Sequence, residues 1–435
     1  MSRASTTCKC NRSITSDSLQ AVTADNLPRL WASGSWTWSM FSACSTSSST
    51  PSLFNNYHIA NSEPLFLPSP SVTTMATNIR DFAAASLEPH DYILEESINQ
   101  KIFDQLIVQE ELAHLKDVGH LTDGVQPIVV FVVGQTGAGK TRLAADLLGP
   151  IQGRQPAHII ADVYKTYHPE YTSILKIAPH LASPATSTDA RKWLDLASKW
   201  AIQRKIDVLL ESACRHPEDF TSLISAFHTA GYRVLVALMA VPECLSLLGT
   251  MVRYYKRLSE AQSANIPLRV TPRKVHYETY DGILAAADFI DNSTAATNVV
   301  VVRRNNLVAY QNYRGPGGLW VRPASALASL DLERTRPLPV EEHGSFLADC
   351  HYVEEQKGKS GLAEATLGDV EASLAGLMSM GGRLSASFPA LKPLDVEEWV
   401  LGNWDVNKAK IETQEEREVV IPRNSILQES ARVEH

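Results

Sequence analysis

The chain has 435 residues, of which 44% are hydrophobic, and this is enough for one large α/β core with appended segments. Its net charge of −8 repels nucleic acid and anionic membrane surfaces, so neither is an expected partner. Six cysteines lie scattered without C-x-x-C spacing, which argues against a disulfide framework or structural zinc site. With no apolar run as long as a membrane span, the sequence predicts a cytoplasmic protein.

The first 75 residues are rich in serine and threonine, poor in acidic residues, and show no sustained helical or strand period. This composition predicts a mostly disordered extension over residues 1–75. A few basic residues within it leave an N-terminal organellar targeting segment open as a second interpretation. Over residues 76–119, apolar residues recur at intervals of three and four, which predicts an amphipathic helical segment packed on the domain that follows.

The centre of the chain alternates short apolar runs with segments of helical period. Continuous apolar strands separated by helices are typical of a parallel sheet that is buried on both faces. Residues 120–315 are therefore predicted to form one doubly wound α/β domain, and residues 316–435 a mostly helical extension with a loose tail. The apolar runs that we interpret as strands lie at 127–133, 158–164, 206–212, 233–241 and 298–304.

A phosphate-binding motif of the form G-x-x-x-x-G-K-[ST] follows the first apolar run and directly precedes a segment of good helix formers. Its glycines let successive backbone N–H groups turn toward phosphates, and the helix N-terminus adds positive potential. We expect Lys140 to reach the β and γ phosphates of ATP and the Thr141 hydroxyl to bind Mg²⁺. The motif predicts a P-loop NTPase-type fold. The predicted nucleotide-binding residues are Gly134, Gln135, Thr136, Gly137, Ala138, Gly139, Lys140 and Thr141.

Charged residues lie at the ends of two predicted strands, and ligands of open parallel sheets gather beyond the carboxyl ends of the strands. Asp162 is near the end of one, with Lys165 and His168 shortly after it, and Glu211 is at the end of the next, with Arg215 four residues later. A carboxylate beside the γ-phosphate can accept the proton of an attacking hydroxyl, and Asp162 is our candidate for this general base. Two alternatives stay open: Asp162 caps the next helix, or Glu211 acts through metal or water.

Arginines that follow the core strands are suited to clamp a phosphoryl group. Arg253 and Arg257 lie one turn apart on a predicted helix, and Arg269 lies in a loop before the next helix. Arginines on a mobile segment near a nucleotide can stabilise the charge of the transferring group. Considered alone, each arginine could instead be a solvent-exposed residue without a functional role, and this is the alternative interpretation. The position of these residues favours a lid over the nucleotide.

Five segments between about residue 128 and residue 304 resemble the zeta toxin kinases, which are P-loop enzymes whose bacterial members phosphorylate UDP-N-acetylglucosamine. By this resemblance Asp162 matches the catalytic base and Lys140 the Walker lysine. Arg253 and Arg269 look like the family's phosphate-clamping arginines. The resemblance runs from about residue 128 to residue 304 and rests on GQTGAGKT, ADVYKTYHPEY, DVLLES, TAGYRVLVALMAVPECLSLLGTMVRYYKR and LRVTPRKVH.

The same resemblance implies substrate contacts and reveals one departure. Asp195 falls on the helix where the family has an acidic substrate contact, and Glu211 matches the acid of the family's E-G-T motif, with Arg215 following. Here Ser212 and Ala213 replace the glycine and threonine, so a hydroxyl that would touch the sugar is missing. Losing one such hydrogen bond costs about 1 kcal/mol, which puts the identity of the sugar in question more than the reaction. The resemblance leaves an antitoxin partner open.

Together these features predict an ATP- and Mg²⁺-dependent kinase that acts on a hydroxyl of a small molecule, such as UDP-N-acetylglucosamine. Another small-molecule or nucleotide kinase is the alternative on the same scaffold. A non-catalytic ATP-binding interaction module is the alternative from a different class, but it has no need to keep Asp162, Arg253 and Arg269 together. The predicted substrate-binding residues are Lys165, His168, Asp195, Glu211 and Arg215.

Overall fold

The computed structural model describes residues 88–115, 125–263, 268, 271–315, 317–357 and 391–402, together with residues 374, 376 and 378. The predicted disordered extension over residues 1–75 and the loose tail at the carboxyl end therefore lie outside the described residues. Within the part of the chain that the structure does describe, no helix is both long and apolar enough to cross a membrane.

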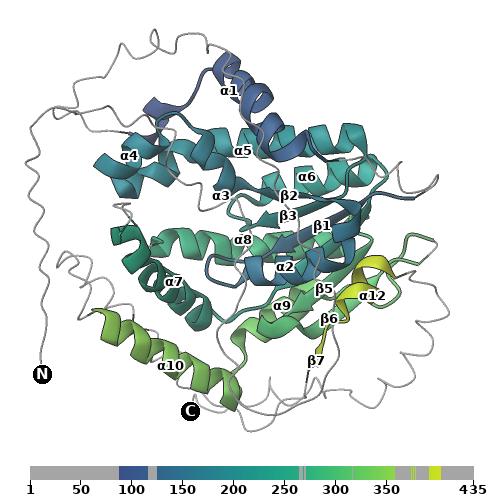
Figure 1. The fold of residues 1–435 in the computed structure, drawn as a ribbon. Coiled ribbons are helices and arrows are strands. Elements are labelled where there is room, and N and C mark those ends of the chain that lie inside the picture. Colours follow the sequence, from purple (N-terminus) through teal and green to yellow (C-terminus); the bar gives the residue numbers. More distant parts are fainter. Residues whose placement is uncertain are drawn as a thin grey trace, which may run out of the picture. The chain divides into compact units, whose positions relative to one another are not determined.

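A seven-stranded sheet in the order β2-β3-β1-β4-β5-β6-β7 forms the centre of the described structure (Figure 1). The first five strands of this order are parallel, and β6 and β7 add an antiparallel edge beside β5. The predicted doubly wound α/β fold with a parallel sheet is confirmed. The strands are β1 (Ile128–Val133), β2 (Ala157–Ile160), β3 (Val208–Ser212), β4 (Arg233–Met239), β5 (Asn298–Val302), β6 (Leu307–Tyr313) and β7 (Lys392–Pro393).

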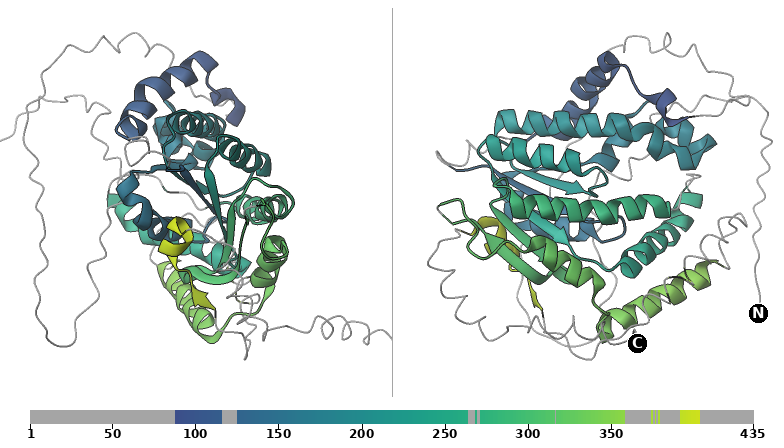
Figure 2. Two further views of the ribbon diagram at one scale, coloured as in Figure 1. Left: turned by 90° about the vertical axis from the view of Figure 1, so that its right-hand side faces the viewer. Right: turned by 180° about the vertical axis from the view of Figure 1, so that it is seen from behind.

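Helices connect the parallel strands and cover both faces of the sheet (Figure 2). The larger helices are α1 (Glu96–Ile102), η4 (Phe103–Leu112), α2 (Lys140–Ile151), α4 (Tyr171–Ile177), α5 (Pro179–Arg204), α6 (Pro217–Thr229), α7 (Glu243–Ser263), α8 (Arg273–Asn292), α9 (Ala326–Thr335), α10 (Val340–Lys357) and α12 (Val396–Leu401). Short helical segments are η3 (Pro89–Tyr92), η6 (Gln152–Arg154), α3 (Ala161–Tyr164), η7 (Lys165–Tyr167) and η8 (Arg304–Asn306).

Local sequence explains where several helices begin and end. Pro217 opens α6, where the missing proline N–H has no helical partner to lose, and acidic residues follow in its first turn. Gly231 lies just past the end of α6 with φ of +82°, a conformation that glycine adopts without steric cost. Prolines also open α5 and precede α8. These residues set the helix boundaries that carry the chain back to each new strand.

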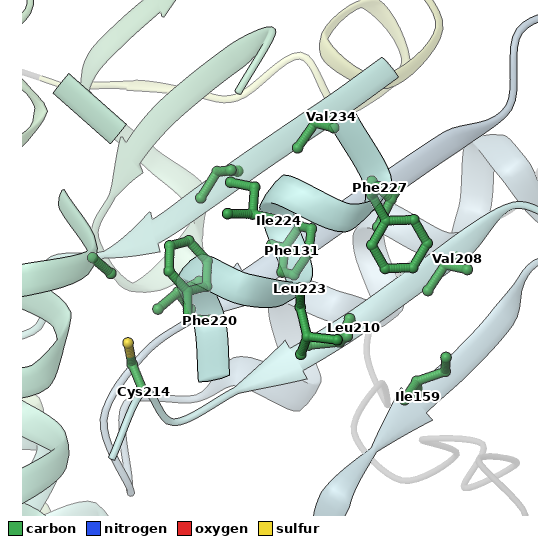
Figure 3. Close-up of a cluster of buried hydrophobic side chains, with 14 of the residues drawn as sticks. Phe131, Ile159, Val208, Leu210, Cys214, Phe220, Leu223, Ile224, Phe227 and Val234 are labelled. Carbon is green, nitrogen blue, oxygen red and sulfur yellow. The ribbon is translucent and has the colours of Figure 1, made fainter. Parts of the chain in front are cut away.

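Alternate residues of β1, β3, β4 and β5 enter two separate hydrophobic cores. Phe131 faces the core beneath α5, α6 and α8, whereas Val130 and Val132 face the core beneath α2 and α7. In the first core Phe131 packs edge-to-face on Phe220 and Phe227, with ring centroids 5.5 and 5.9 Å away (Figure 3). Because both faces are buried, the strands are continuously apolar, as the sequence predicted.

The C-terminal elements pack on the α/β domain. Helix α12 packs on α2, α10 packs on α7, and α9 packs on α8 and on the edge strands β5 and β6. Trp399 on α12 is fully buried in the same core as α2. The described elements of the predicted 316–435 extension therefore share the core of the domain that carries the P-loop.

One predicted strand was too long. The run 158–164 was expected to be extended throughout, but β2 ends at Ile160 and the chain turns into α3 at Ala161. Val163 and Tyr164 favour strands by propensity, and the burial of Tyr164 is compatible with either structure. Asp162 therefore lies in the first turn of a short helix, two residues past Ile160, which takes the N-cap position that the sequence had offered to Asp162 as an alternative.

Candidate active site

The P-loop spans residues 134–141 between β1 and α2, and its glycines are required by geometry. Gly137 and Gly139 have φ of +79° and +104°, in the left-handed region that side chains disfavour. A Cβ atom on Gly137 would lie 1.9 Å from the carbonyl oxygen of Ser246 on α7. The loop therefore takes this shape only because glycine allows both its backbone conformation and its close approach to α7.

Lys140 lies at the first position of α2 and turns back over its own loop. Its Nζ donates to the carbonyl oxygens of Gly134 at 2.8 Å and Gln135 at 3.3 Å. Burial lowers the pKa of Lys140 to about 8, partly opposed by the nearby carboxylate of Glu211. The ammonium group is therefore charged at neutral pH and lies where a phosphate would compete for it.

Thr141, Glu211 and His158 form a chain of contacts beside the P-loop. The Thr141 hydroxyl donates to Glu211 Oε2 at 3.3 Å, and Glu211 Oε1 lies 3.0 Å from His158 Nε2. Glu211 is 7% exposed and is the last residue but one of β3, which pairs directly with β1. A hydroxyl and a carboxylate oxygen converging beside a phosphate loop fit Mg²⁺, which takes oxygen ligands and is usually held by one or two protein groups plus phosphates and water. This geometry puts Glu211 beside the predicted metal ligand Thr141.

Asp162 faces solvent at the carboxyl edge of the sheet. Its carboxylate is 2.6 Å from Lys165 Nζ, which also donates to the Ser183 hydroxyl on α5 at 2.8 Å. The Asp162 side chain is 74% exposed, whereas that of Lys165 is only 14% exposed. Lys165 lowers the pKa of Asp162 to about 2 through its charge and its hydrogen bond, and the charges of Lys140 and Arg253 add to this effect. Asp162 is therefore an ionised hydrogen-bond acceptor throughout the physiological range.

Electrostatic coupling links the P-loop, α3 and α7. The charge of Arg253, an exposed residue of α7, contributes to lowering the pKa of both Lys140 and Asp162. Asp162 in turn raises the pKa of Lys140. The charges of Asp162 and Arg253 therefore both influence Lys140, and those of Lys140 and Arg253 both influence Asp162. The fourth, Arg269, lies outside the described residues.

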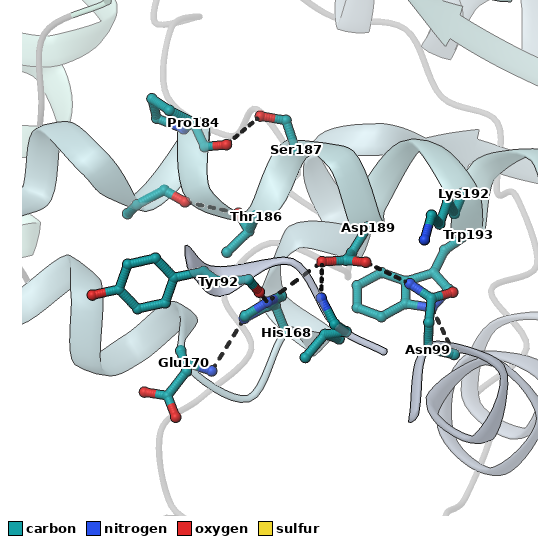
Figure 4. A network of polar contacts seen from close by, with 12 residues as sticks. Tyr92, Asn99, His168, Glu170, Pro184, Thr186, Ser187, Asp189, Lys192 and Trp193 are labelled. Carbon is teal, nitrogen blue, oxygen red and sulfur yellow. Dashed lines mark hydrogen bonds and ion pairs between the residues drawn. The ribbon is translucent and has the colours of Figure 1, made fainter. Parts of the chain in front are cut away.

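His168 does not face this site. Its imidazole is fully buried, its Nε2 lies 3.0 Å from the Tyr92 carbonyl and 3.6 Å from Asp189, and its Nδ1 accepts the backbone N–H of Glu170 (Figure 4). Because a carbonyl only accepts, Nε2 donates to Tyr92, while Nδ1 is the acceptor. Both ring nitrogens are engaged, so the predicted substrate contact is wrong for this conformation. Through its hydrogen bond to the Tyr92 carbonyl, His168 instead connects the segment before α1 to the α/β domain.

Asp195 is also removed from the site. It lies on α5 twelve residues after Ser183, which places it about 18 Å further along the helix axis. Its carboxylate pairs with Lys199 one turn later, at 2.7 Å. The structure therefore does not bring Asp195 together with Lys165 and Ser183, and its contact with the substrate stays a prediction.

Arg215 follows β3 and pairs with Glu278 on α8, with Nε 2.6 Å from Oε2. Its side chain is 38% exposed, so Arg215 is only partly covered by this ion pair. Ser212, which replaces a glycine of the family motif, accepts the backbone N–H of Cys214 through its hydroxyl at 3.0 Å. The turn after β3 is thus closed by its own residues.

Sequence reasoning missed three residues of this region. His158 and Ser183 could not be distinguished in the sequence from structural residues, since His158 lies within an apolar strand and Ser183 within a long helix. Arg304 could have been identified from the sequence, because it closely follows β5. Asp162 and Glu211 were chosen for the same reason, as charged residues at the end of a strand. Arg304 Nη2 donates to the carbonyl oxygens of Gly137 at 3.0 Å and Leu245 at 2.9 Å, which ties the P-loop to α7.

Comparison with known proteins identifies the region that holds these residues. Residues 112–314 match the family model described as Zeta toxin. Toxin zeta of Enterococcus hirae is 21% identical over 219 residues, which cover 50% of this chain and 74% of that protein. Toxin PezT of Streptococcus pneumoniae serotype 4 is 27% identical over 129 residues, covering 30% of this chain and 51% of that protein.

The chain is also similar to a solved structure of the PezAT chromosomal toxin-antitoxin system of Streptococcus pneumoniae. The identity is 16% and the TM-score 0.48, and the match covers 63% of this chain and 98% of that chain. The segment matched by the family model contains the P-loop, Asp162, Glu211 and Arg253, and it ends before α9.

Proposed function

We propose that the chain is a kinase that transfers the γ-phosphate of ATP to a hydroxyl of a small molecule, because residues 112–314 match the Zeta toxin family model and contain a P-loop. The observation that carries the proposal is the P-loop with Thr141 in contact with Glu211, together with Asp162 just past the end of a strand of the same parallel sheet. A P-loop alone binds nucleotide. An ionised carboxylate at Asp162 and a cation at Arg253, whose charges both influence the pKa of Lys140, supply what transfer needs in addition.

Asp162 is proposed to orient the acceptor. With a pKa of about 2 it is a weak base, so it removes no proton before the reaction begins. It accepts a hydrogen bond from the acceptor hydroxyl and takes the proton as the bond to phosphorus forms. Such a late transfer agrees with the loose transition state of most phosphoryl transfers, in which positioning and charge stabilisation matter most.

Lys140 and Arg253 are proposed to stabilise the charge of the transferring group. Lys140 approaches from the P-loop and Arg253 from α7, so two cations act on the phosphoryl oxygens from different elements. Arg269, just before α8, is proposed to join them by its match to the family motif. Thr141, with Glu211 beside it, would hold Mg²⁺, which supplies neutralisation of phosphate charge when bound.

The acceptor proposed first is a UDP-activated amino sugar, such as UDP-N-acetylglucosamine. The resemblance of the segments around Asp162 and Glu211 to the zeta toxin kinases supports it. Ala213 offers no hydroxyl, so recognition of the sugar would use other groups than in the family pattern; the Ser212 hydroxyl, which accepts the backbone N–H of Cys214, can still donate its own proton. Lys165 and Arg215 are the proposed contacts that remain at this edge of the sheet.

A screen of acceptors tests the proposal. Purified protein with Mg²⁺ and ATP is given UDP-sugars, nucleosides or free sugars one at a time, and ADP release is followed. We expect one class of acceptor to raise ADP release, and Lys140→Ala to weaken both ATP binding and turnover. If no acceptor stimulates ATP consumption while ATP still binds, the protein is a nucleotide-binding module and the proposal fails.

A further inference from the structure

The Gln135 side chain of the P-loop belongs to a buried network of hydrogen bonds. One member of this network comes from outside the segment that matches the family model. That member is Arg334, near the end of α9. Its Nη2 donates to the side-chain oxygen of Gln135, the second residue of the P-loop, at 3.0 Å. The contact joins the C-terminal part of the chain directly to the phosphate-binding motif.

Gln135 is the residue through which this support acts. Its side chain is fully buried, and its Nε2 donates to the Val241 carbonyl at 2.7 Å and to the Ser246 hydroxyl at 3.1 Å. Arginine can only donate and a carbonyl can only accept, so these partners fix the orientation of the amide. Only the backbone of Gln135 is free to face a nucleotide, and its carbonyl already receives Lys140 Nζ.

Arg334 is held in one position. Its Nη1 donates to the Tyr280 carbonyl at 2.7 Å, and its guanidinium lies 3.8 Å from the centroid of the Tyr280 ring. The residue is 4% exposed. Stacking, two hydrogen bonds and burial leave the guanidinium little freedom, so it can fix the position of the group to which it donates.

The charge of Arg334 is not neutralised by a direct partner. Among the described residues no carboxylate lies within ion-pair distance of it, and its hydrogen bonds go to neutral oxygens. Burial lowers the pKa of Arg334 to about 10, so the group stays charged at neutral pH. Tyr280, Asp281 and Asp331 oppose this shift in pKa, but no carboxylate among the described residues pairs directly with the cation, which lies behind a loop built to receive anions. Its charge is already felt by neighbouring His276, whose pKa falls to about 4 mainly through burial.

We infer that Arg334 is a positioning residue for nucleotide binding, which holds Gln135 and hence the P-loop backbone while adding positive potential behind the phosphates. The inference rests on the proposed function, in which the P-loop binds ATP. It makes α9 part of the nucleotide site although α9 follows the segment matched by the family model.

The test measures the affinity of Mg-ATP by calorimetry, without an acceptor. Arg334→Met keeps the length of the side chain and removes its charge and donors, and we expect ATP affinity to fall about 10- to 100-fold, as for a lost charged hydrogen bond. Arg334→Lys keeps the charge and should lose less. Leu332→Gln is the matched control, because this residue of the same helix is 55% exposed, and it should bind ATP like the wild type.

A double-mutant cycle separates positioning from a general loss of structure. In a Gln135→Leu background, Arg334→Met should cost much less affinity than in the wild type, because the contact is already absent. Equal losses in both backgrounds, or Arg334→Met and Arg334→Lys proteins that bind ATP within twofold of wild type, would overturn the inference. Absence of ATP binding by the wild-type protein would overturn the proposed function itself.

Discussion

The P-loop side and the acceptor side of the site are built in different ways. On the P-loop side, Gly137 touches the backbone of α7 and the Gln135 side chain is fully buried. On the acceptor side, Asp162 is 74% exposed and is held by one ion pair to Lys165. The P-loop side is a closely packed backbone loop, whereas the acceptor side consists of exposed charged side chains. Substitutions should therefore disturb binding and stability on one side, and turnover on the other.

Asp162→Asn should give the largest effect and show that the acceptor side serves turnover alone. The amide keeps the shape of the side chain but accepts a proton poorly, so we expect kcat to fall roughly 10²- to 10⁴-fold. Acceptor-dependent ADP release measures this. Calorimetry with Mg-ATP should find an affinity within about threefold of wild type. Unchanged turnover would remove Asp162 from the mechanism.

Gly137→Ala should break the P-loop side. The substitution puts a Cβ 1.9 Å from the Ser246 carbonyl and forces alanine to φ of +79°. Strain and overpacking together should cost roughly 2–4 kcal/mol of unfolding free energy and abolish tight ATP binding. Denaturant unfolding and calorimetry measure the two effects. Gly149→Ala on α2, where an added Cβ meets nothing within 4 Å, should retain both properties.

Glu211 lies between the P-loop side and the acceptor side, and Glu211→Gln tests whether its carboxylate contributes to the Mg²⁺ site. Because Glu211 contacts Thr141 and is also held by His158, loss of its charge should lower kcat about 10- to 100-fold and raise the Mg²⁺ concentration needed for half-maximal rate. His158→Gln should raise the Mg²⁺ requirement less, since it acts only through Glu211. Titration of Mg²⁺ at saturating ATP checks both variants. An unchanged Mg²⁺ requirement in Glu211→Gln would place this acid outside the metal site.

The pH dependence of ATP binding should be the smallest effect. Lys140 has a pKa of about 8 and attracts phosphate only when protonated, so affinity is full below pH 8 and weakens above it. One protonation predicts a loss of about tenfold between pH 7 and pH 9. Calorimetry across this range should show the loss in the wild type and a flat profile in Lys140→Ala. A wild-type profile that stays flat would separate Lys140 from phosphate binding.

The sequence predicted the P-loop side better than the acceptor side because the former depends on local residues. The glycines, Lys140 and Thr141 lie in one motif between a strand and a helix, so their spacing defines their geometry. The continuous apolar runs likewise predicted the parallel strands. The supports of the loop, Arg304 and Arg334, are more than 150 residues away in sequence, and their contacts exist only in the folded chain.

The acceptor side escaped prediction for a related reason. His168 matched a family motif, yet its ring partners include Tyr92, 76 residues away, which no local pattern reveals. Asp195 was assigned by its helix, but the position along α5 decides which edge of the sheet it meets. β6 and β7 were not predicted, because β6 is only partly buried and β7 has two residues. Only Asp162 and Lys165, which lie directly past a strand, were found together from the sequence.

The central claim is that this domain moves the γ-phosphate of ATP onto a hydroxyl, and mass spectrometry of the acceptor tests it most directly. UDP-N-acetylglucosamine, or the acceptor selected by the ADP-release screen, is incubated with Mg²⁺ and ATP and then weighed. We predict that it gains one phosphoryl group with wild-type protein and gains almost none with Asp162→Asn, although the variant binds ATP. Consumption of ATP that releases only free phosphate and leaves every acceptor unmodified would contradict the account.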